Sequence, residues 1–272
     1  MIEISVIIPY FNKFQRLKQT ISSLNQQVFE KKFEVIIVDD GSFVPLEEEI
    51  KMNGIHIRFP LEIIRVENKG RSAARNTGVS HSKGNILLFI DDDVVLPENL
   101  IHNHYNWHKS LQYNAFVHSK VMEDISLLVC EDLDNNGKSS RLSSRSREKV
   151  RFQYSTIELL LMKRKNQDFD WCGFIGNNVS VKKEVFHATI GFRESFIGWG
   201  CEDFDMGYQL IKNGVSFIFD DTCVIHLSHK RESNHNYEME SNFDRFYQFY
   251  QDEKIHKLYL YLTKRLSLEE VF

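Results

Sequence analysis

Apolar segments that alternate with helical patterns restrict the fold of this chain more than any other feature. The segments "EISVIIPYF", "FEVIIVDD", "LEIIRVEN" and "GNILLFIDDD" read as strands. Apolar positions from Phe14 to Val28 recur at spacings of three and four, which predicts a helix, and "GRSAARNTGVSHS" is a second expected helix. Strands that are apolar throughout are typical of a parallel sheet covered on both faces. We therefore expect an α/β fold with a mostly parallel central sheet flanked by helices.

The composition allows a full hydrophobic core and argues against one class of partner. The chain has 272 residues, of which 42% are hydrophobic and 12% aromatic. This length suits one large domain or two small ones, and no linker or internal repeat divides the sequence. Its 34 basic and 38 acidic residues give a net charge of -4, whereas a nucleic-acid-binding protein usually has a strong basic excess. We expect no nucleic-acid partner.

The sequence predicts a cytoplasmic protein. The segment "MIEISVIIPYFNK" lacks the basic and apolar regions of a signal peptide, and no apolar run approaches the roughly 18 residues that span a membrane. Cys130, Cys172, Cys201 and Cys223 form no CxxC pair, which favours reduced thiols over a zinc site. The aromatic C-terminal segment could pack on the core, mediate a dimer or contact the inner face of a membrane peripherally. Core packing is the favoured alternative.

Three consecutive carboxylates follow the fourth apolar segment. In an extended chain, Asp91 and Asp93 share one side and Asp92 faces the other. Mg²⁺ and Mn²⁺ favour carboxylate oxygens and commonly share their coordination shell with substrate phosphate. Ligands of parallel sheets bind beyond the carboxyl ends of the strands. The pattern indicates a metal–diphosphate site, with a solvated acidic turn as the alternative.

Two further motifs belong to the same expected sheet edge. Asp39 and Asp40, at the end of "VIIVDD", could bind a base or ribose, or could cap the next helix. Arg71 and Arg75 are four residues apart, on one face of the expected helix. Their guanidinium groups suit phosphate, with a surface ion pair as the alternative.

The second half of the sequence contains "GWGCEDFDMG". Gly198 and Gly200 free the backbone around Trp199, whose ring can stack on a sugar. Glu202 and Asp203 then begin an expected helix. Acids at this position interact with the helix dipole, and they are also candidates for catalysis.

Two histidines and a polar loop complete the features of the second half. "VSFIFDDTCVIHLSH" reads as a strand pair or a bent strand and carries His226 and His229, either of which could complete a metal site. Residues 134–150 are rich in serine and arginine, which predicts a loop. This loop could be a lid or a plain insertion.

The motifs "SVIIPYFN", "VIIVDDGS", "GRSAARNTG", "LLFIDDDVVLP" and "GWGCEDFDMGYQLIKNG" occur in this order. The ordered set, from about Ile4 to His229, resembles family 2-type glycosyltransferases with the GT-A, Rossmann-like fold. Its last block is similar to the GWG-ED segment of β-1,4-galactosyltransferases and GalNAc-transferases. The resemblance implies a GT-A domain over residues 1–233, with a nucleotide-binding half at about 1–118 and a smaller acceptor half at about 119–233. Residues 234–272 would form a helical extension.

The resemblance also implies roles on the donor side of the site. Pro9 and Tyr10 would line the nucleotide base, and Asp40 would bind a uracil-type ring. Arg71 and Arg75 would close over the nucleotide.

A metal site is implied next to this nucleotide. Asp93, together with Asp91, would bind Mn²⁺ or Mg²⁺, and Asp92 would face the ribose. His226 is the preferred additional ligand and His229 the second choice.

On the acceptor side, the resemblance implies that Trp199, Gly200 and Glu202 contact the acceptor and that Asp203 is the catalytic base. One base and no evident carboxylate nucleophile favour direct displacement with inversion. The expected function is metal-dependent transfer of a hexose or N-acetylhexosamine from a UDP-sugar to a hydroxyl of a glycan or other acceptor. A metal-dependent nucleotidyltransferase and a non-catalytic sugar-nucleotide-binding module are the alternatives. The oligomeric state stays open.

Overall fold

The computed structural model describes residues 1–125, 152–229 and 235–271. The serine- and arginine-rich loop expected at 134–150 lies outside the described residues, as does Cys130. Within the described residues the strands form one sheet in the order β3-β2-β1-β4-β8-β6-β9-β5, and β7 pairs with β6. The strands are β1 Ile2–Tyr10, β2 Lys32–Asp39, β3 Leu61–Arg65, β4 Ile86–Ile90, β5 Val94–Val95, β6 Ala115–Asp124, β7 Phe152–Gln153, β8 Asn178–Lys182 and β9 Ser216–Leu227.

The first four strands confirm the expected parallel sheet. Strand β1 pairs in parallel with β2 and β4, and β2 pairs in parallel with β3. Both faces are covered, because every residue of β4 is buried and β1 is buried from Ile4 to Ile8. The carboxyl ends of β1, β2 and β4 therefore meet at one edge, which carries Tyr10, Asp40 and Asp91.

The second half of the sheet mixes strand directions and curls. Strand β8 is antiparallel to β4 and β6, while β6 and β9 are parallel. A shift in the β6–β9 register after Ser119 shows that β9 is one bent strand rather than a strand pair. Only residues 91–93 separate β4 from β5, yet β5 pairs with β9 at the far end of the strand order. The end of the strand order formed by β9 and β5 therefore lies next to the triple-aspartate segment.

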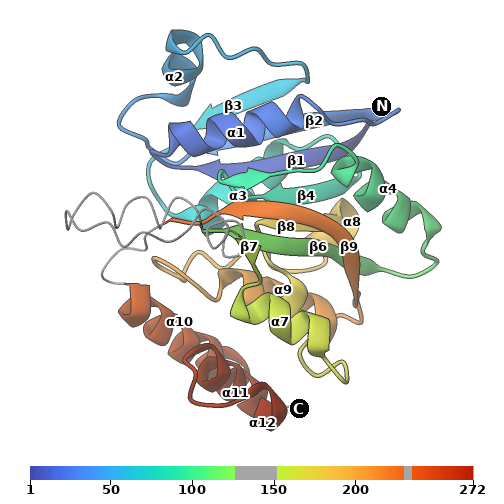
Figure 1. The fold of residues 1–272 in the computed structure, drawn as a ribbon, viewed down its shortest axis with the longest axis vertical. Coiled ribbons are helices and arrows are strands. Elements are labelled where there is room, and N and C mark those ends of the chain that lie inside the picture. The colour runs from blue at the N-terminus through green and yellow to red at the C-terminus, as the bar shows by residue number, and fades with distance from the viewer. Residues whose placement is uncertain (126–151, 230–234, 272) are drawn as a thin grey trace, which may run out of the picture.

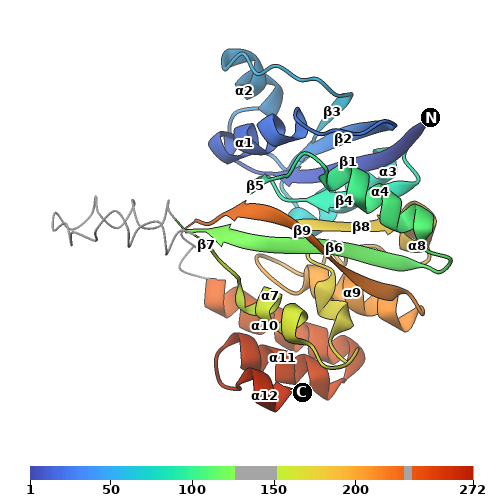
Figure 2. The same ribbon diagram turned by 45° about the vertical axis from the view of Figure 1, so that its right-hand side comes forward.

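Helices cover the sheet on both faces. In Figures 1 and 2, α1 lies against the β1–β2 half, and α7, α9 and α10 to α12 gather at the opposite end of the molecule from α2. The first helix buries Phe14, Leu17, Ile21 and Leu24 as expected, but it ends there, and Val28 is 63% exposed. The helices are α1 Phe14–Leu24, α2 Leu46–Met52, α3 Arg71–His81, α4 Leu100–Ser110, α7 Thr156–Lys163, η1 Asp170–Gly173 (a 3₁₀-helix), α8 Lys183–His187, α9 Glu202–Lys212, α10 His235–Tyr250, α11 Glu253–Leu262 and α12 Leu268–Val271.

The C-terminal aromatic segment is a helical hairpin rather than a single helix. The chain breaks at Gln251, where φ is 50° and Asp252 caps α11 by accepting from the Lys254 amide. Phe246 and Leu258 are fully buried in the same cluster as Trp171. The expected packing on the core is confirmed. None of the helices in the described ranges is both long and apolar enough to cross a bilayer.

Candidate active site

The end of β2 contains one structural and one candidate functional aspartate. Asp39 accepts from the amides of Ser42 and Leu46 and from Arg65, so it holds the turn before α2. Asp40 accepts at 2.9 Å from the Lys69 amide with one oxygen and from the Gly70 amide with the other. Burial raises the pKa of Asp40 despite these hydrogen bonds. Asp40 therefore holds the start of α3 close to the sheet edge.

The base-lining residues predicted on β1 differ in exposure. Pro9 is half-buried, and the Tyr10 ring is buried. Burial, together with the nearby charges of Glu49 and Asp39, raises the pKa of Tyr10 to about 12. Tyr10 therefore remains a neutral phenol beside this acidic edge. The contact of either residue with a nucleotide stays a prediction.

The triple-aspartate segment does not follow the expected alternation. The chain turns at Asp92 and Asp93 instead of continuing as a strand, so the rule that residues i and i+2 share a side does not apply. Asp91 accepts from Arg75 at 2.9 Å, whereas Asp93 contacts His226 and His229. Burial, and then the charge of Asp93, raise the pKa of Asp92 to about 8. Each carboxylate thus has its own environment.

Arg75 connects the two halves of the site. Its side chain is fully buried, and its Nη1 lies 2.9 Å from Asp203 Oδ1 and 3.4 Å from Glu202 Oε1, while Nη2 bonds to Asp91. Burial alone lowers the pKa of Arg75, but the three carboxylates outweigh it and raise it. Arg75 thus lies in a buried network rather than in a surface ion pair. Arg71, which is 37% exposed, lies 3.4 Å from Glu202.

Asp203, the candidate base, is mostly buried but keeps part of its side chain accessible. Its Oδ2 accepts from the Gly176 amide at 2.9 Å, and its side chain is 19% exposed. Burial raises the pKa of Asp203 to about 7, against the opposing effect of Arg75. A Cβ at Gly176 would lie 2.3 Å from Arg75 Nη2, so only glycine fits there. Each carboxylate oxygen has a second lone pair, so Asp203 can still accept a proton.

Asp93, His226 and His229 form a set of metal-ligating groups. One ligand atom from each lies within 4.8 Å of the other two. Strand pairing explains this proximity, because Val94 pairs with His226 across β5 and β9 and the Leu227 amide donates to the Asp93 carbonyl. One carboxylate and two imidazoles suit a divalent ion such as Mn²⁺. Asp91 does not belong to this set, and its role as a metal ligand stays a prediction.

Glu123, which belongs to none of the sequence motifs, supports the metal-ligating set. Its Oε2 lies 2.7 Å from His226 Nδ1, and this leaves His226 Nε2, 3.2 Å from Asp93, as the ligand atom. Burial alone lowers the pKa of His226, but Asp93 and Glu123 outweigh it and raise it to about 10. A carboxylate behind a histidine is the usual support for a metal ligand. Glu123 also pairs with His226 in the β6–β9 register, a signal that only appears once the pairing is known.

The segment around Trp199 is held by α10. Gly198, Gly200 and Cys201 have φ values of 75°, 103° and 72°, so the chain loops before α9 begins at Glu202. Glu238 accepts from the Trp199 amide at 3.0 Å.

A second residue of α10 completes this clamp. Asn242 donates to the carbonyls of Ile197 and Trp199 at 3.0 and 3.1 Å, and its side chain is buried. Glu238 and Asn242 follow the last sequence motif, so the sequence does not indicate their contact with the loop around Trp199.

Comparison with known proteins places this site in a family. The model of Glycosyl transferase family 2 matches residues 5–186. The chain belongs to glycosyl transferase family 2. A second model, described as N-terminal domain of galactosyltransferase, matches residues 160–238. The two matches together cover the β1–β9 sheet and the loop that contains Trp199.

Curated relatives that are named as glycosyltransferases resemble most of the chain. An uncharacterized glycosyltransferase, YfnE, of Bacillus subtilis is 27% identical over 83% of this chain and 64% of its own length. The validoxylamine A glucosyltransferase of Streptomyces hygroscopicus subsp. jinggangensis is 26% identical over 89% of this chain and 60% of its own length. The chain thus spans less than two thirds of these relatives.

Solved structures confirm the expected fold class. Staphylococcus aureus TarS 1-349 in complex with UDP-GlcNAc has a TM-score of 0.61 at 17% identity, covering 94% of this chain and 65% of that one. The mannosyltransferase PcManGT of Pyrobaculum calidifontis, in complex with GDP-Man and Mn²⁺, has a TM-score of 0.60 at 18% identity, covering 84% and 58%. At these identities the likeness concerns the fold.

Proposed function

We propose that this family 2 chain is a metal-dependent, inverting glycosyltransferase that moves a hexose or N-acetylhexosamine from a UDP-sugar to an acceptor hydroxyl. One observation carries the proposal. The triple-aspartate turn is bonded on one side, through Asp93, to two histidines, and on the other, through Asp91 and Arg75, to Asp203. A metal-ligating set and a candidate base thereby flank one turn at the ligand-binding edge of the sheet.

The proposed donor site is the edge formed by β1, β2 and α3, within residues 1–118. Pro9 and Tyr10 would flank the base, Asp40 would accept from the uracil ring, and Asp92 would face the ribose. Arg71 is the partly exposed arginine of α3 and would contact the diphosphate. The UDP-GlcNAc bound to TarS and the GDP-Man bound to PcManGT support a nucleotide-sugar donor.

The proposed metal ligands are Asp93, His226 and His229, with Asp91 as a further candidate. A divalent ion at this position would neutralise charge on the leaving diphosphate. Burial alone raises the pKa of Asp93, but hydrogen bonds with the two histidines outweigh it and hold the pKa well below its usual range. Asp93 is therefore ionised, as a metal ligand must be.

The proposed acceptor half is residues 119–233, where Trp199, Gly200 and Glu202 would contact the acceptor. The acceptor oxygen bonds to the anomeric carbon while the bond from that carbon to the phosphate oxygen breaks. The bonding electrons leave with the diphosphate, and the proton of the hydroxyl moves to Asp203. Attack opposite the leaving group inverts the anomeric configuration. The match of residues 160–238 to the galactosyltransferase model supports this half of the proposal.

A panel of nucleotide sugars, incubated with the protein and Mn²⁺, tests the proposal. We expect one UDP-sugar to release UDP and to raise the melting temperature of the protein. Release of pyrophosphate from a nucleotide and a sugar phosphate would instead show nucleotidyl transfer. Donor binding without turnover on any acceptor class would favour a binding module.

The pH dependence of transfer should follow Asp203. Only the ionised carboxylate accepts a proton, and the pKa of Asp203 is about 7. We expect kcat/KM, measured at saturating metal, to rise about tenfold per pH unit below this value and to level off above it. A flat profile across neutral pH would exclude Asp203 as the base.

Loss of the hydrogen bonds from α10 to the loop around Trp199 should weaken binding of the acceptor more than binding of the donor. Asn242→Ala removes two hydrogen bonds to the loop around Trp199, so we expect KM for the acceptor to rise roughly tenfold. KM for the donor should stay unchanged. Asn106→Ala, an exposed position on α4, serves as the control. Equal losses for donor and acceptor would point to general destabilisation instead.

A further inference from the structure

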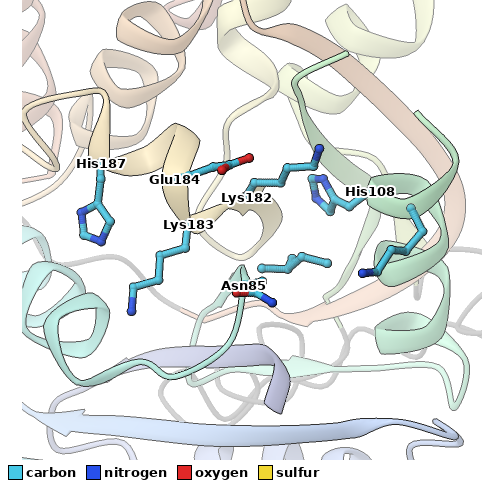
Figure 3. A pocket seen from close by; sticks show the side chains of 8 residues that line it. Asn85, His108, Lys182, Lys183, Glu184 and His187 are labelled. Atoms are coloured by element: carbon cyan, nitrogen blue, oxygen red, sulfur yellow. The ribbon is translucent and has the colours of Figure 1, made fainter. Parts of the chain in front are cut away.

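A cavity lies at the opposite end of β4 from the triple-aspartate turn. It has a volume of about 440 Å³ and lies between the start of β4, the end of α4 and the β8–α8 junction (Figure 3). Ile86 on β4 pairs with Lys182 on β8 at its floor. Because β4 is a five-residue strand, about 16 Å separate this cavity from the proposed donor site. The two sites are therefore distinct.

The cavity has a basic lining. Lys109, Lys182 and Lys183 contribute three ammonium groups, and Glu184 is the one acid among the described lining residues. Lys109 Nζ is 3.6 Å from Glu3, and Lys183 Nζ donates to the Ser82 carbonyl at 2.6 Å. Lys182 has no carboxylate partner within the described residues, which leaves its charge available for an anion.

A buried histidine nitrogen provides a second, independent observation. The His108 ring lines the cavity beside Lys182 (Figure 3) and is 4% exposed. Its Nε2 is 2.8 Å from Ser180 Oγ. Its Nδ1 has no hydrogen-bond partner within the described residues. A buried polar atom without a partner is costly in a native protein, and among such atoms in the described residues this one belongs to a side chain that lines the cavity.

The surrounding hydrogen bonds determine what His108 offers. Asn178 donates its amide to the Ser119 carbonyl, so its Oδ1 must accept from His104 Nε2 at 3.0 Å. His104 Nδ1 then accepts the hydroxyl proton of Ser180 at 2.7 Å. The Ser180 oxygen can only accept from His108 Nε2, which leaves the neutral His108 with a lone pair on Nδ1. The cavity thus combines cationic groups with a buried imidazole nitrogen that can accept a hydrogen bond.

We propose that this cavity binds a phosphate group that carries a hydroxyl, as in a sugar phosphate, a polyol phosphate or hydrogen phosphate itself. The anionic oxygens would interact with Lys182 and the neighbouring lysines, and the hydroxyl would donate to His108 Nδ1. An anion without a proton satisfies only half of this site. The volume suits a small phosphate ester.

Titration of the ¹⁵N-labelled protein with inorganic phosphate and with sulfate, followed by NMR, tests this. Hydrogen phosphate has a P–OH group at neutral pH and sulfate has none. We expect phosphate, at concentrations on the order of 10 mM, to shift the amides around Asn85, His108 and Lys182. Sulfate should bind several-fold more weakly. Shifts at Asp40 and Arg71 would report the proposed donor site separately, so the two proposals can fail independently.

Two variants complete the experiment. Lys182→Met keeps the aliphatic stem and should weaken phosphate binding roughly tenfold. Lys18→Met, on the exposed side of α1, should leave it unchanged. Glycerol phosphate, with its additional hydroxyls, distinguishes an ester site from one for free phosphate by binding more tightly. No shift at these amides, equal affinity for sulfate, or equal effects of the two variants would overturn the proposal.

Discussion

Replacing Asp203 by asparagine is expected to lower kcat about 10³-fold while leaving donor binding intact. The amide keeps the size of the carboxylate, and its single oxygen can accept from the Gly176 amide or from Arg75 but not from both. It cannot take the proton of the acceptor hydroxyl. Arg75 retains Asp91 and Glu202 as partners, so the network should persist. The measurements are sugar transfer under saturating substrates and donor affinity by calorimetry.

Glu202→Gln is the matched control for this experiment. Glu202 precedes Asp203 on α9 and contacts the same arginine, but its side chain is 3% exposed and that of Asp203 is 19% exposed. Of these two acids in the proposed acceptor site, Asp203 is therefore the one placed to take the proton of the reacting hydroxyl. We expect a much smaller loss of kcat than for Asp203→Asn. Full turnover by Asp203→Asn would disprove the base assignment. A parallel loss of donor binding would show that Asp203 supports the fold of the site rather than proton transfer.

Removal of the divalent ion is expected to abolish transfer, and Mn²⁺ or Mg²⁺ should restore it. His226→Ala removes a ligand of the proposed set, so transfer should fall by at least about 100-fold. The wild type should gain thermal stability with added Mn²⁺, because a ligand that binds only the native state stabilises it. The variant should lose this gain. Melting curves with and without Mn²⁺ measure this effect independently of activity.

Glu123→Gln tests the support of the metal ligand His226. The substitution removes the negative charge next to His226 Nδ1 but keeps all three proposed metal ligands. We expect the affinity for Mn²⁺ to fall by about 10- to 100-fold, with activity recovered at high metal concentration. His102→Ala, an exposed position on α4, is the control. Undiminished transfer by the wild type in excess chelator would contradict the metal role of Asp93 and both histidines.

The parallel half of the fold was predictable because its signals are local. Each of the first four strands is an apolar run, α3 lies within the expected helix "GRSAARNTGVSHS", and α9 begins at Glu202 as expected. Parallel pairing then brings Asp40 and Asp91 to one edge. The residue types indicate that His226 or His229 can complete a metal site, and the resemblance favours His226; the structure brings both histidines to Asp93.

The missed features depend on pairings between distant segments. Glu123 reaches His226 because β6 and β9 share a register after a shift. Gly176 donates to Asp203 because the segment before β8 passes beside α9. Glu238 accepts from Trp199 because α10 packs against the loop that precedes α9. The alternation rule failed at Asp92 because the chain turns to enter β5. No pattern within a single segment encodes such contacts.

The buried guanidinium of Arg75 has a consequence for how this site can change during evolution. It shares its charge among Asp91, Glu202 and Asp203, which come from two distant parts of the sequence. Loss of the arginine would remove the cation that Asp91 and Asp203 share and would leave Glu202 with Arg71. Loss of one acid would remove a hydrogen-bond acceptor from the buried guanidinium group. We therefore expect these four positions to be inherited as a unit, so that related chains either retain all four or replace them together.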